Sequence, residues 1–450
     1  MSDTTRAGAA PAGTTGAAPN PAELLRSAAY LRMLLLAAVL GVPISALAYG
    51  FLVAVAFLQD VLFRRLPTAL GLGPAPAWWP LPVLAVGGLL VACTIRYLPG
   101  GGGHSPADGF SNHPPPTGRE LPGVILAATA TLAFGAVLGP EAPLIAIGGG
   151  LAVLAVRTAK ASLAPSAITV VASTGSFAAI STLLGSPLLG AFLLMEAAGI
   201  GGATLGLVLL PGLLASGIGS LIFVGLDSLT GLGSVSLALP DLPPFARPDL
   251  AQFGWAIVIG LVAAVLGTAI SWTGLRLRAL VDRSRLLLTT LAGLVVGGLA
   301  TVYALTTGHA TSDVLFSGQA ALPGLLTGAA SYSLGALVLL VACKAVGYAV
   351  SLSAFRGGPV FPAMFVGAAV GLALAPLPGM AIVPGVAMGI GAMCVVMLRL
   401  PLTSVMLAVL LLGTDGLVVT PLVIVAVVVA HVAAARLRPA PHPVEAATAP

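Results

Sequence analysis

Charge-free stretches dominate this chain. Asp, Glu, Lys and Arg are absent from the windows 33–59, 66–95, 161–195, 197–226, 250–275, 314–343 and 357–398. An α-helix needs about 20 apolar residues to cross the hydrocarbon core of a bilayer, and each of these windows is longer than that. The windows therefore predict an all-α, polytopic membrane protein.

The composition excludes several other classes of protein. Charged residues form only 7% of the 450 residues, and hydrophobic residues form 58%. A soluble domain carries about 25% charged residues. So few charged residues cannot give a soluble enzyme a hydrated surface. The same composition excludes a disordered protein and a nucleic-acid binder. The Cys and His residues show no spacing typical of metal ligands, so we expect no metal and no cofactor.

The chain divides into two membrane halves between two polar tails. Residues 1–22 are rich in Ala, Pro, Gly and Thr. We predict that this segment is a disordered tail, and that residues 436–450 form a second one. The first half comprises residues 23–226 and the second comprises residues 251–435. Residues 227–250, which hold three acids and one Arg, are predicted to form an external linker.

Two sequence motifs occur once in each half. Residues 139–148 (GPEAPLIAIG) and 358–367 (GPVFPAMFVG) share the pattern G-P-x-x-P-x-x-x-Φ-G, where Φ is apolar, at an offset of 219 positions. Pro187-Leu188 and Pro401-Leu402 follow at an offset of 214 positions. Matching order and offset indicate an internal repeat. If each half crosses the bilayer an odd number of times, the repeats are inverted and their broken helices meet near the midplane.

Basic residues set the predicted orientation in the membrane. Those that do so are Arg26, Arg32, Arg276, Arg278, Arg283 and Arg285, and the last four share one loop. Positive charge favours the cytoplasmic side. We therefore expect a multi-pass protein of the inner (plasma) membrane with both termini in the cytoplasm.

Each G-P-x-x-P motif is predicted to begin a helix inside the membrane. Gly permits a close approach of the backbone, and Pro suits the first helical turn, where its missing N–H has no partner to lose. The free N–H groups and the positive end of the helix dipole would then point at one spot. Two such starts that face each other make an anion site. The alternative is a pair of Pro-kinked helices that only pack.

Glu141 lies inside the first of these helix starts. A carboxylate at membrane depth is costly and points to a function. At a helix N-terminus the carboxylate would occupy the place of an anion. Competition with a permeating anion would make it a gate, and protonation would release it. The alternative is that Glu141 is a structural N-cap acid.

Three further charged residues lie within apolar sequence. Glu196 ends an apolar segment, where it either faces water or offers a step in a proton path. Lys344 is predicted to snorkel toward the membrane surface. Arg356, two residues before the second helix start, either adds positive potential to the anion path or pairs with a lipid headgroup.

These motifs resemble those of the CLC family of chloride channels and anion/proton antiporters, over most of residues 30–435. GPEAP (139–143) is similar to the family's G-[KR]-E-G-P segment, and GGPVFP (357–362) to its G-x-F-x-P segment. GGGGHSP (100–106) is similar to its G-S-G-I-P loop, and GSPLLGAFLLME (185–196) to its N-x-P-L-x-G-x-x-F-x-x-E helix.

The resemblance implies an inverted-repeat architecture of many short, tilted and broken helices, and a homodimer with one pore in each subunit. It also implies a pathway for chloride or another small anion, with Glu141 as the gate. The anion-binding positions fall on Gly103, His104, Ser105, Glu141, Ala142, Val360 and Phe361.

Several departures from the family pattern bear on the mechanism. The family's anion-binding Ser falls on Gly103, and Pro359 stands where the family offers a backbone N–H. The internal proton-transfer Glu falls on Ala197, next to Glu196, and the inner Tyr lies on a helix that we expect to be missing after Arg438. We therefore expect a passive, glutamate-gated chloride channel. The alternative is a chloride/proton antiporter in which Glu196 serves the proton path.

Two other classes stay open. A cation-coupled transporter of an organic solute could share the broken helices, but it should hold more acids within the membrane. An intramembrane enzyme would need a nucleophile–base pair or a metal site, and the sequence shows no such spacing, so we expect no enzyme.

Overall fold

The computed structural model describes residues 25–438 apart from 110–113, 160–164, 182, 185, 198, 200–202, 232–244 and 246. Within this part of the chain the regular elements are helices, and eight are long and apolar enough to cross a membrane. The prediction of an all-α, polytopic membrane protein is therefore confirmed. Most of both predicted tails and of the 227–250 linker lies outside the described residues.

The helices of the first half are α2 (Ala28–Asp60), α3 (Leu66–Ala69), α4 (Pro80–Tyr97), α5 (Leu121–Ala133), α6 (Glu141–Thr158), α7 (Pro165–Ile180), α8 (Pro187–Ala197) and α9 (Ala203–Thr230). Those of the second half are α10 (Leu250–Val281), α11 (Arg285–Thr307), α12 (Leu322–Thr327), α13 (Leu334–Ala354), α14 (Val360–Leu374), α15 (Ile382–Leu398), α16 (Pro401–Leu411) and α17 (Thr414–Leu437). The short turns are η1 (Val61–Arg65), η2 (Pro99–Gly102), η3 (Pro106–Asp108), η4 (Thr311–Asp313) and η5 (Ala329–Ser331).

The helix boundaries follow local sequence. Asp249 and Gln252 form a capping box at the start of α10, in which each side chain accepts a hydrogen bond from the other residue's backbone N–H. Ser333 caps α13 by accepting from Ala336 N. Gly308, with a φ of +75°, ends α11 in the left-handed conformation.

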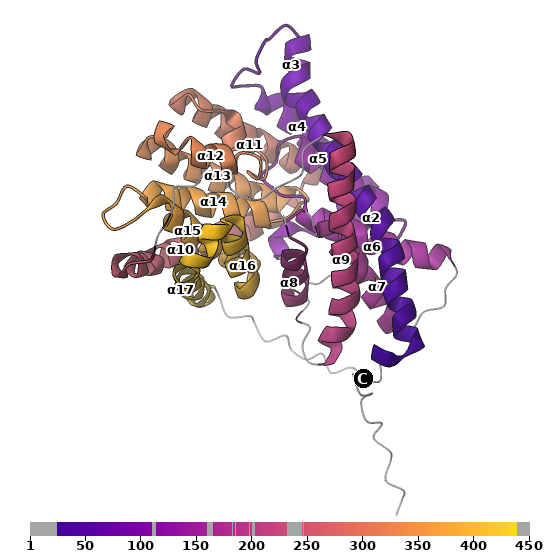
Figure 1. Ribbon diagram of the computed structural model, residues 1–450. Helices are drawn as coiled ribbons and strands as arrows, with labels where there is room; N and C mark the ends of the chain where they lie inside the picture. Colours follow the sequence, from indigo (N-terminus) through magenta and orange to yellow (C-terminus); the bar gives the residue numbers. More distant parts are fainter. Residues whose placement is uncertain are drawn as a thin grey trace, which may run out of the picture.

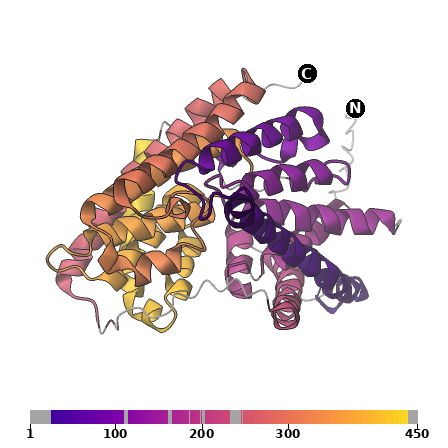
Figure 2. The same ribbon diagram turned by 90° about the horizontal axis from the view of Figure 1, so that it is seen from above.

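The same helix pairs pack in each half. In the first half α6 packs on α7, and α2, α7 and α8 pack on α9; in the second half α14 packs on α15, and α10, α15 and α16 pack on α17. Two contacts, α4 with α11 and α8 with α16, join equivalent helices across the halves. Figures 1 and 2 show the indigo-to-magenta half beside the orange-to-yellow half. The predicted internal repeat is therefore visible in the packing.

The last glycine of each repeated motif is a helix contact. A Cβ added to Gly148 of α6 would lie 2.4 Å from the carbonyl oxygen of Gly175 in α7. A Cβ on Gly367 of α14 would lie 2.2 Å from the carbonyl oxygen of Gly389 in α15. Small residues let membrane helices approach closely without a hydrophobic driving force. The two glycine pairs thus place α6 on α7 and α14 on α15 in the same way.

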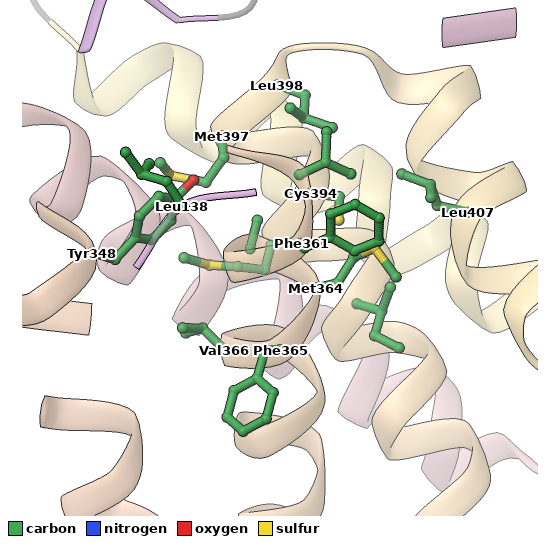
Figure 3. Close-up of a cluster of buried hydrophobic side chains, with 14 of the residues drawn as sticks. Leu138, Tyr348, Phe361, Met364, Phe365, Val366, Cys394, Met397, Leu398 and Leu407 are labelled. Carbon is green, nitrogen blue, oxygen red and sulfur yellow. The ribbon is translucent and has the colours of Figure 1, made fainter. Parts of the chain in front are cut away.

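The core of the second half is built from helices that are too short to cross a bilayer alone. α14 has 15 residues and α15 has 17, and nearly all of them are buried. Figure 3 shows side chains of both helices, among them Phe361, Met364 and Cys394, gathered in one apolar cluster. Outer helices instead expose apolar side chains, such as Leu35 and Leu221, to the surroundings. This pattern is that of broken helices enclosed by a lipid-facing shell.

Candidate functional site

The two G-P-x-x-P motifs meet in the interior of the protein. Gly139 N donates to Gly358 O at 2.8 Å, and Gly358 N donates to Gly139 O at 2.6 Å, which forms an isolated antiparallel bridge. α6 begins at Glu141 and α14 begins at Val360, each directly after the Pro of its motif. Both motifs therefore start helices at one place, as the sequence predicts.

A reciprocal pair of hydrogen bonds holds the two loops that lead into these helices. Val137 N donates to Ser351 Oγ of α13 at 3.0 Å, and Arg356 N donates to Thr131 Oγ1 of α5 at 3.1 Å. Each loop is thus fixed by a hydroxyl from the opposite half. Tyr348 adds a third bond, because its hydroxyl donates to Pro359 O at 2.7 Å. The helix starts are held rigidly against each other.

The Glu141 side chain is completely buried at the start of α14. Its Oε1 accepts from Val360 N at 2.6 Å and from Phe361 N at 3.1 Å. These N–H groups belong to the first turn of α14, where no intrahelical acceptor exists and the helix dipole is positive. Its Oε2 is buried without a hydrogen-bond partner. A carboxylate from the first half of the chain therefore occupies the positive end of a helix in the second half.

The carboxylate fits because glycines flank it. A Cβ on Gly139 would lie 2.0 Å from Glu141 Oε2, and a Cβ on Gly358 would lie 2.3 Å from the same atom. No side chain fits at such distances, so both motif glycines are needed to seat the carboxylate. The first glycine of each motif thus has a direct steric role at the site.

A cavity of about 340 Å³ lies beside the start of α6. Its wall includes Gly103, His104, Ser105, Ala142 and Arg356, together with Ala197 at the end of α8. No Asp or Glu belongs to this wall among the described residues. The Arg278–Asp108 ion pair ties the end of α10 to η3, next to the cavity wall. The cavity therefore lies on the same side as the basic loop after α10.

The predicted site residues fall into two groups. Glu141, Val360 and Phe361 form the buried carboxylate site. Gly103, His104, Ser105 and Ala142 form part of the cavity wall.

Two backbone N–H groups near these residues are already used. Gly103 N donates to Gly100 O at 2.9 Å, and Ala363 N donates to Pro359 O at 3.3 Å within the first turn of α14. Pro359 has no N–H to donate. The N–H groups of Val360 and Phe361 are the donors that the start of α14 offers to the carboxylate.

Glu196 has a structural partner 206 and 207 positions away. Its Oε1 accepts from Leu402 N at 2.9 Å, and its Oε2 accepts from Thr403 N at 2.8 Å and from Thr403 Oγ1 at 2.6 Å. The end of α8 thus caps the start of α16, and the two Pro-Leu motifs are joined across the halves.

Lys344 does not snorkel, so that prediction is wrong. Its side chain is completely buried, and Nζ donates to the carbonyl oxygens of Asp313, Val314 and Leu315 at 2.8, 3.2 and 3.1 Å. The ammonium also lies 4.2 Å from the centre of the Phe365 ring. Three carbonyl oxygens and the face of an aromatic ring solvate the ammonium, in place of the water that it would have at the membrane surface.

Sequence reasoning missed Thr131, Ser351 and Tyr348, which fix the helix starts. Thr131 and Ser351 lie on equivalent helices shortly before each motif. A comparison of polar residues across the repeat would have found Thr131 and Ser351, because they lie at nearly the same distance before the two motifs.

The comparisons with known proteins agree with this architecture. The profile of the family described as voltage gated chloride channel matches residues 87–435. Proteins of Salmonella newport and Salmonella agona, provisionally named the ion-transport protein YfeO, are 29% identical over 355 residues, which cover 78% of this chain and 82% of theirs.

Solved structures share the fold. A slow cyanobacterial Cl⁻/H⁺ antiporter matches with a TM-score of 0.71 and 21% identity, covering 90% of this chain and 95% of its own. A CLC-type fluoride/proton antiporter matches with a TM-score of 0.62 and 19% identity, covering 89% of this chain and 95% of its own. With most of its length matched by the family profile, and with the two helix starts joined at Glu141, the chain belongs to the voltage gated chloride channel family, CLC.

Proposed function

We propose that this protein conducts a small anion, with chloride as the first candidate, past a gate formed by Glu141. One observation carries the proposal: the Glu141 carboxylate accepts the first two N–H groups of α14. Those groups would otherwise bind an anion. The carboxylate and a permeating anion therefore compete for the same donors.

The gate follows from this competition. While Glu141 is ionised and seated, its negative charge and its oxygen atoms exclude an anion from the start of α14. Protonation removes the charge and weakens both hydrogen bonds, because a charged acceptor binds N–H groups more strongly than a neutral one. The side chain then leaves and an anion replaces it. Acid pH is expected to open the path.

Passive conduction is the first candidate because the cavity wall offers no carboxylate for a proton relay among the described residues. Ala197 contributes only a methyl group to that wall. Glu196, one position earlier, is engaged by Leu402 and Thr403 of α16.

A chloride/proton antiporter is the second candidate. Glu196 ends the helix that reaches the cavity, so it could release a proton toward it after breaking its bonds to α16. Two of the solved structures that share the fold are titled proton-coupled antiporters.

A reconstitution experiment separates the two candidates. Purified protein in liposomes is given an outward chloride gradient while chloride and pH electrodes record the external solution. A channel gives chloride efflux that depends on a potassium ionophore and moves no protons uphill. An antiporter draws protons inward against their gradient in proportion to chloride efflux. The absence of anion flux in either form would refute the proposal.

We further propose the arrangement of the protein in the membrane. The basic loop after α10 and both termini face the cytoplasm, the 227–250 linker lies outside, and two copies assemble as a homodimer with one pathway each. Single cysteines placed at exposed Arg276 and at Arg247, labelled from outside by an impermeant reagent, test the orientation. If the reagent labels Arg276→Cys and does not label Arg247→Cys, the orientation is the opposite of the one proposed. Cross-linking in liposomes tests the dimer.

A further inference from the structure

The peptide group between Pro359 and Val360 is hydrogen-bonded at both ends. Its carbonyl oxygen, Pro359 O, accepts from the Tyr348 hydroxyl at 2.7 Å, and its N–H donates to Glu141 Oε1 at 2.6 Å. The carbonyl and the N–H of a peptide share one resonance system, so a hydrogen bond to the oxygen polarises the N–H. Tyr348 is therefore linked to the Glu141 carboxylate through a single peptide group.

This chain of hydrogen bonds is shielded from water. Tyr348 and Glu141 are 0% exposed, and Pro359 is buried as well. Figure 3 shows Tyr348 among the buried side chains. Hydrogen bonds are electrostatically stronger in a medium of low dielectric, and bonds arranged in a chain strengthen one another there by about 10–30% each. The Tyr348 hydroxyl therefore makes the N–H of Val360 a stronger donor than it would be alone.

The two bonds that hold the carboxylate differ in length. Val360 N lies 2.6 Å from Glu141 Oε1, and Phe361 N lies 3.1 Å from the same atom. Both N–H groups belong to the first turn of α14, where no intrahelical acceptor exists. The shorter bond comes from the peptide group that Tyr348 also bonds.

Pro359 O depends on Tyr348 for its main hydrogen bond. Its intrahelical donor, Ala363 N, lies at 3.3 Å, beyond the usual N–H···O distance of about 2.9–3.0 Å. In the first motif the equivalent oxygen, Pro140 O, accepts from Leu144 N at 3.0 Å. The start of α14 thus relies on a side chain where the start of α6 relies on its own backbone.

The internal repeat shows that Tyr348 is not part of the shared scaffold. The offsets of 219 positions between the motifs and 220 between Thr131 and Ser351 place Ala128 or Thr129 at the equivalent of Tyr348. Ala128 has no hydroxyl, and Thr129 Oγ1 donates within its own helix at 2.8 Å. The loop-fixing hydroxyls of Thr131 and Ser351 occur in both halves, whereas Tyr348 serves the one helix start that holds the carboxylate.

No charged side chain competes with this effect at Glu141. The carboxylate has no salt bridge among the described residues. The titratable groups that interact with it are the Tyr348 hydroxyl of α13 and the Cys394 thiol of α15, and α14 contributes backbone N–H groups. The hold on the carboxylate therefore depends on the donor strength of these N–H groups.

We propose that Tyr348 is a positioning residue of the gate, whose hydroxyl strengthens the Val360 N–H and thereby sets the pH at which the Glu141 carboxylate leaves its seat. This role rests on the proposed function and deepens it. Tyr348 touches neither the carboxylate nor the anion through its own hydrogen bond, and it acts through the Pro359–Val360 peptide group.

The sign of the effect follows from the charge of the acceptor. Removing the Tyr348 hydroxyl weakens the Val360 donor, and the ionised carboxylate loses more than the neutral carboxyl because charge makes it the stronger acceptor. Tyr348→Phe should therefore raise the pH midpoint of protonation by about 0.1–0.7 pH unit. Replacing Tyr348 by 3-fluorotyrosine, whose more acidic hydroxyl is a stronger donor, should lower the midpoint.

Infrared difference spectroscopy on the purified protein tests this order. The protonated carboxyl of Glu141 has its own band, which is identified by its loss in Glu141→Gln. Titration in gluconate buffer without chloride removes the competition with chloride. Chloride efflux from liposomes is then recorded against pH with the same proteins. Both midpoints should be lowest with 3-fluorotyrosine at position 348, introduced by nonsense suppression, and highest in Tyr348→Phe.

Tyr49→Phe is the matched control. The Tyr49 hydroxyl shares a hydrogen bond with Thr230 Oγ1 at 2.6 Å, which joins α2 to α9 away from both motifs. This variant loses the same atom and one hydrogen bond, so its melting temperature reports that loss. Both of its pH midpoints should equal those of the wild type.

The outcomes separate this role from a structural one and from the proposed function. If Tyr348 only packs, 3-fluorotyrosine, which keeps the ring and the bond, leaves the carboxyl midpoint unchanged, and the role of Tyr348 falls. Equal midpoints in Tyr348→Phe and the wild type overturn it too, even where Glu141→Gln abolishes the pH response of flux and so upholds the gate. If the carboxyl midpoints follow donor strength but no protein conducts an anion, the hold of Tyr348 on the carboxylate stands and the proposed function fails.

Discussion

Val360 donates its backbone N–H to the Glu141 carboxylate at 2.6 Å, so the first residue of α14 is bound by the first residue of α6, 219 positions earlier. One hydrogen bond thus joins the two halves of the chain and caps a helix, and in the proposed function it also closes the anion path.

Replacing Glu141 by Gln should abolish the response of anion flux to pH. The amide carries no charge at any pH and holds the two N–H groups of α14 only weakly. Chloride efflux from liposomes, measured at about pH 7 and about pH 4, on either side of the ordinary Glu pKa, should be the same for the variant and should rise in acid for the wild type.

Glu120→Gln is the control for this experiment. Glu120 lies before α5, and its carboxylate accepts from Thr117 N at 2.6 Å. This backbone N–H holds the pKa of Glu120 below its usual value. Its variant should keep the wild-type response. A pH response that persists in Glu141→Gln would remove Glu141 from the gate.

Gly358→Ala should open the path at neutral pH. The new Cβ would lie 2.3 Å from Glu141 Oε2, so the carboxylate must leave its seat. Chloride efflux at about pH 7 should approach the acid-pH rate of the wild type. In a Glu141→Ala background the same substitution has no carboxylate to displace and should leave the flux unchanged. A methyl group that raises flux in both backgrounds would show that it acts elsewhere.

Gly367→Ala should destabilise the protein by about 1–3 kcal/mol, because its Cβ would lie 2.2 Å from Gly389 O and overpack α14 against α15. Thermal unfolding in detergent measures the effect. Gly254→Ala in α10 is the matched control, since nothing lies within 4 Å of the added Cβ. It should be neutral or stabilising by up to about 1 kcal/mol. Equal melting temperatures would argue against tight packing of α14 on α15.

Glu196→Ala should lower stability by about 1 kcal/mol through loss of the cap on α16. Thr403→Ala removes the hydroxyl that donates to the same carboxylate. Because the residues share one bond, the double variant should cost less than the sum of the single variants. If Glu196 is only a cap, chloride flux stays unchanged and protons remain uncoupled. Additive costs would show that the two side chains do not interact.

Lys344→Met should cost about 1–3 kcal/mol, because the carbonyl oxygens of Asp313, Val314 and Leu315 would lose their shared donor. Met has a similar length, so the change removes the ammonium, with its contact to the Phe365 ring, while it keeps most of the side-chain volume. Chemical denaturation measures the difference. A variant as stable as the wild type would mean that these carbonyls find other donors.

The sequence predicted the parts of the fold that depend on local pattern. Charge-free windows predicted the spans, and the repeated Gly-Pro motifs predicted that helices start at Glu141 and Val360. Both signals are strong because the bilayer penalises charge and the first helical turn accepts Pro.

Residues whose role depends on a distant partner could not be predicted in this way. Glu196 looks like the end of a helix until α16 is placed against it. Lys344 is predicted to lie at the surface because its acceptors are backbone carbonyl oxygens of residues 313–315. The sequence does not show where these oxygens point. Arg356 Nε donates to the carbonyl oxygens of Gly101 and Gly103, more than 250 positions away, and no local pattern gives these partners.

The bridge between Gly139 and Gly358 also has a consequence for biosynthesis. Ribosomes add about 5–20 residues per second, so roughly 10–40 s separate the emergence of the two glycines. During that interval the first half sits in the translocon or the lipid with Glu141 lacking its native partners. Newly made chains therefore pass through a stage in which a membrane chaperone, or an early protonation of that carboxylate, would lower the cost of an unpaired charge in the membrane.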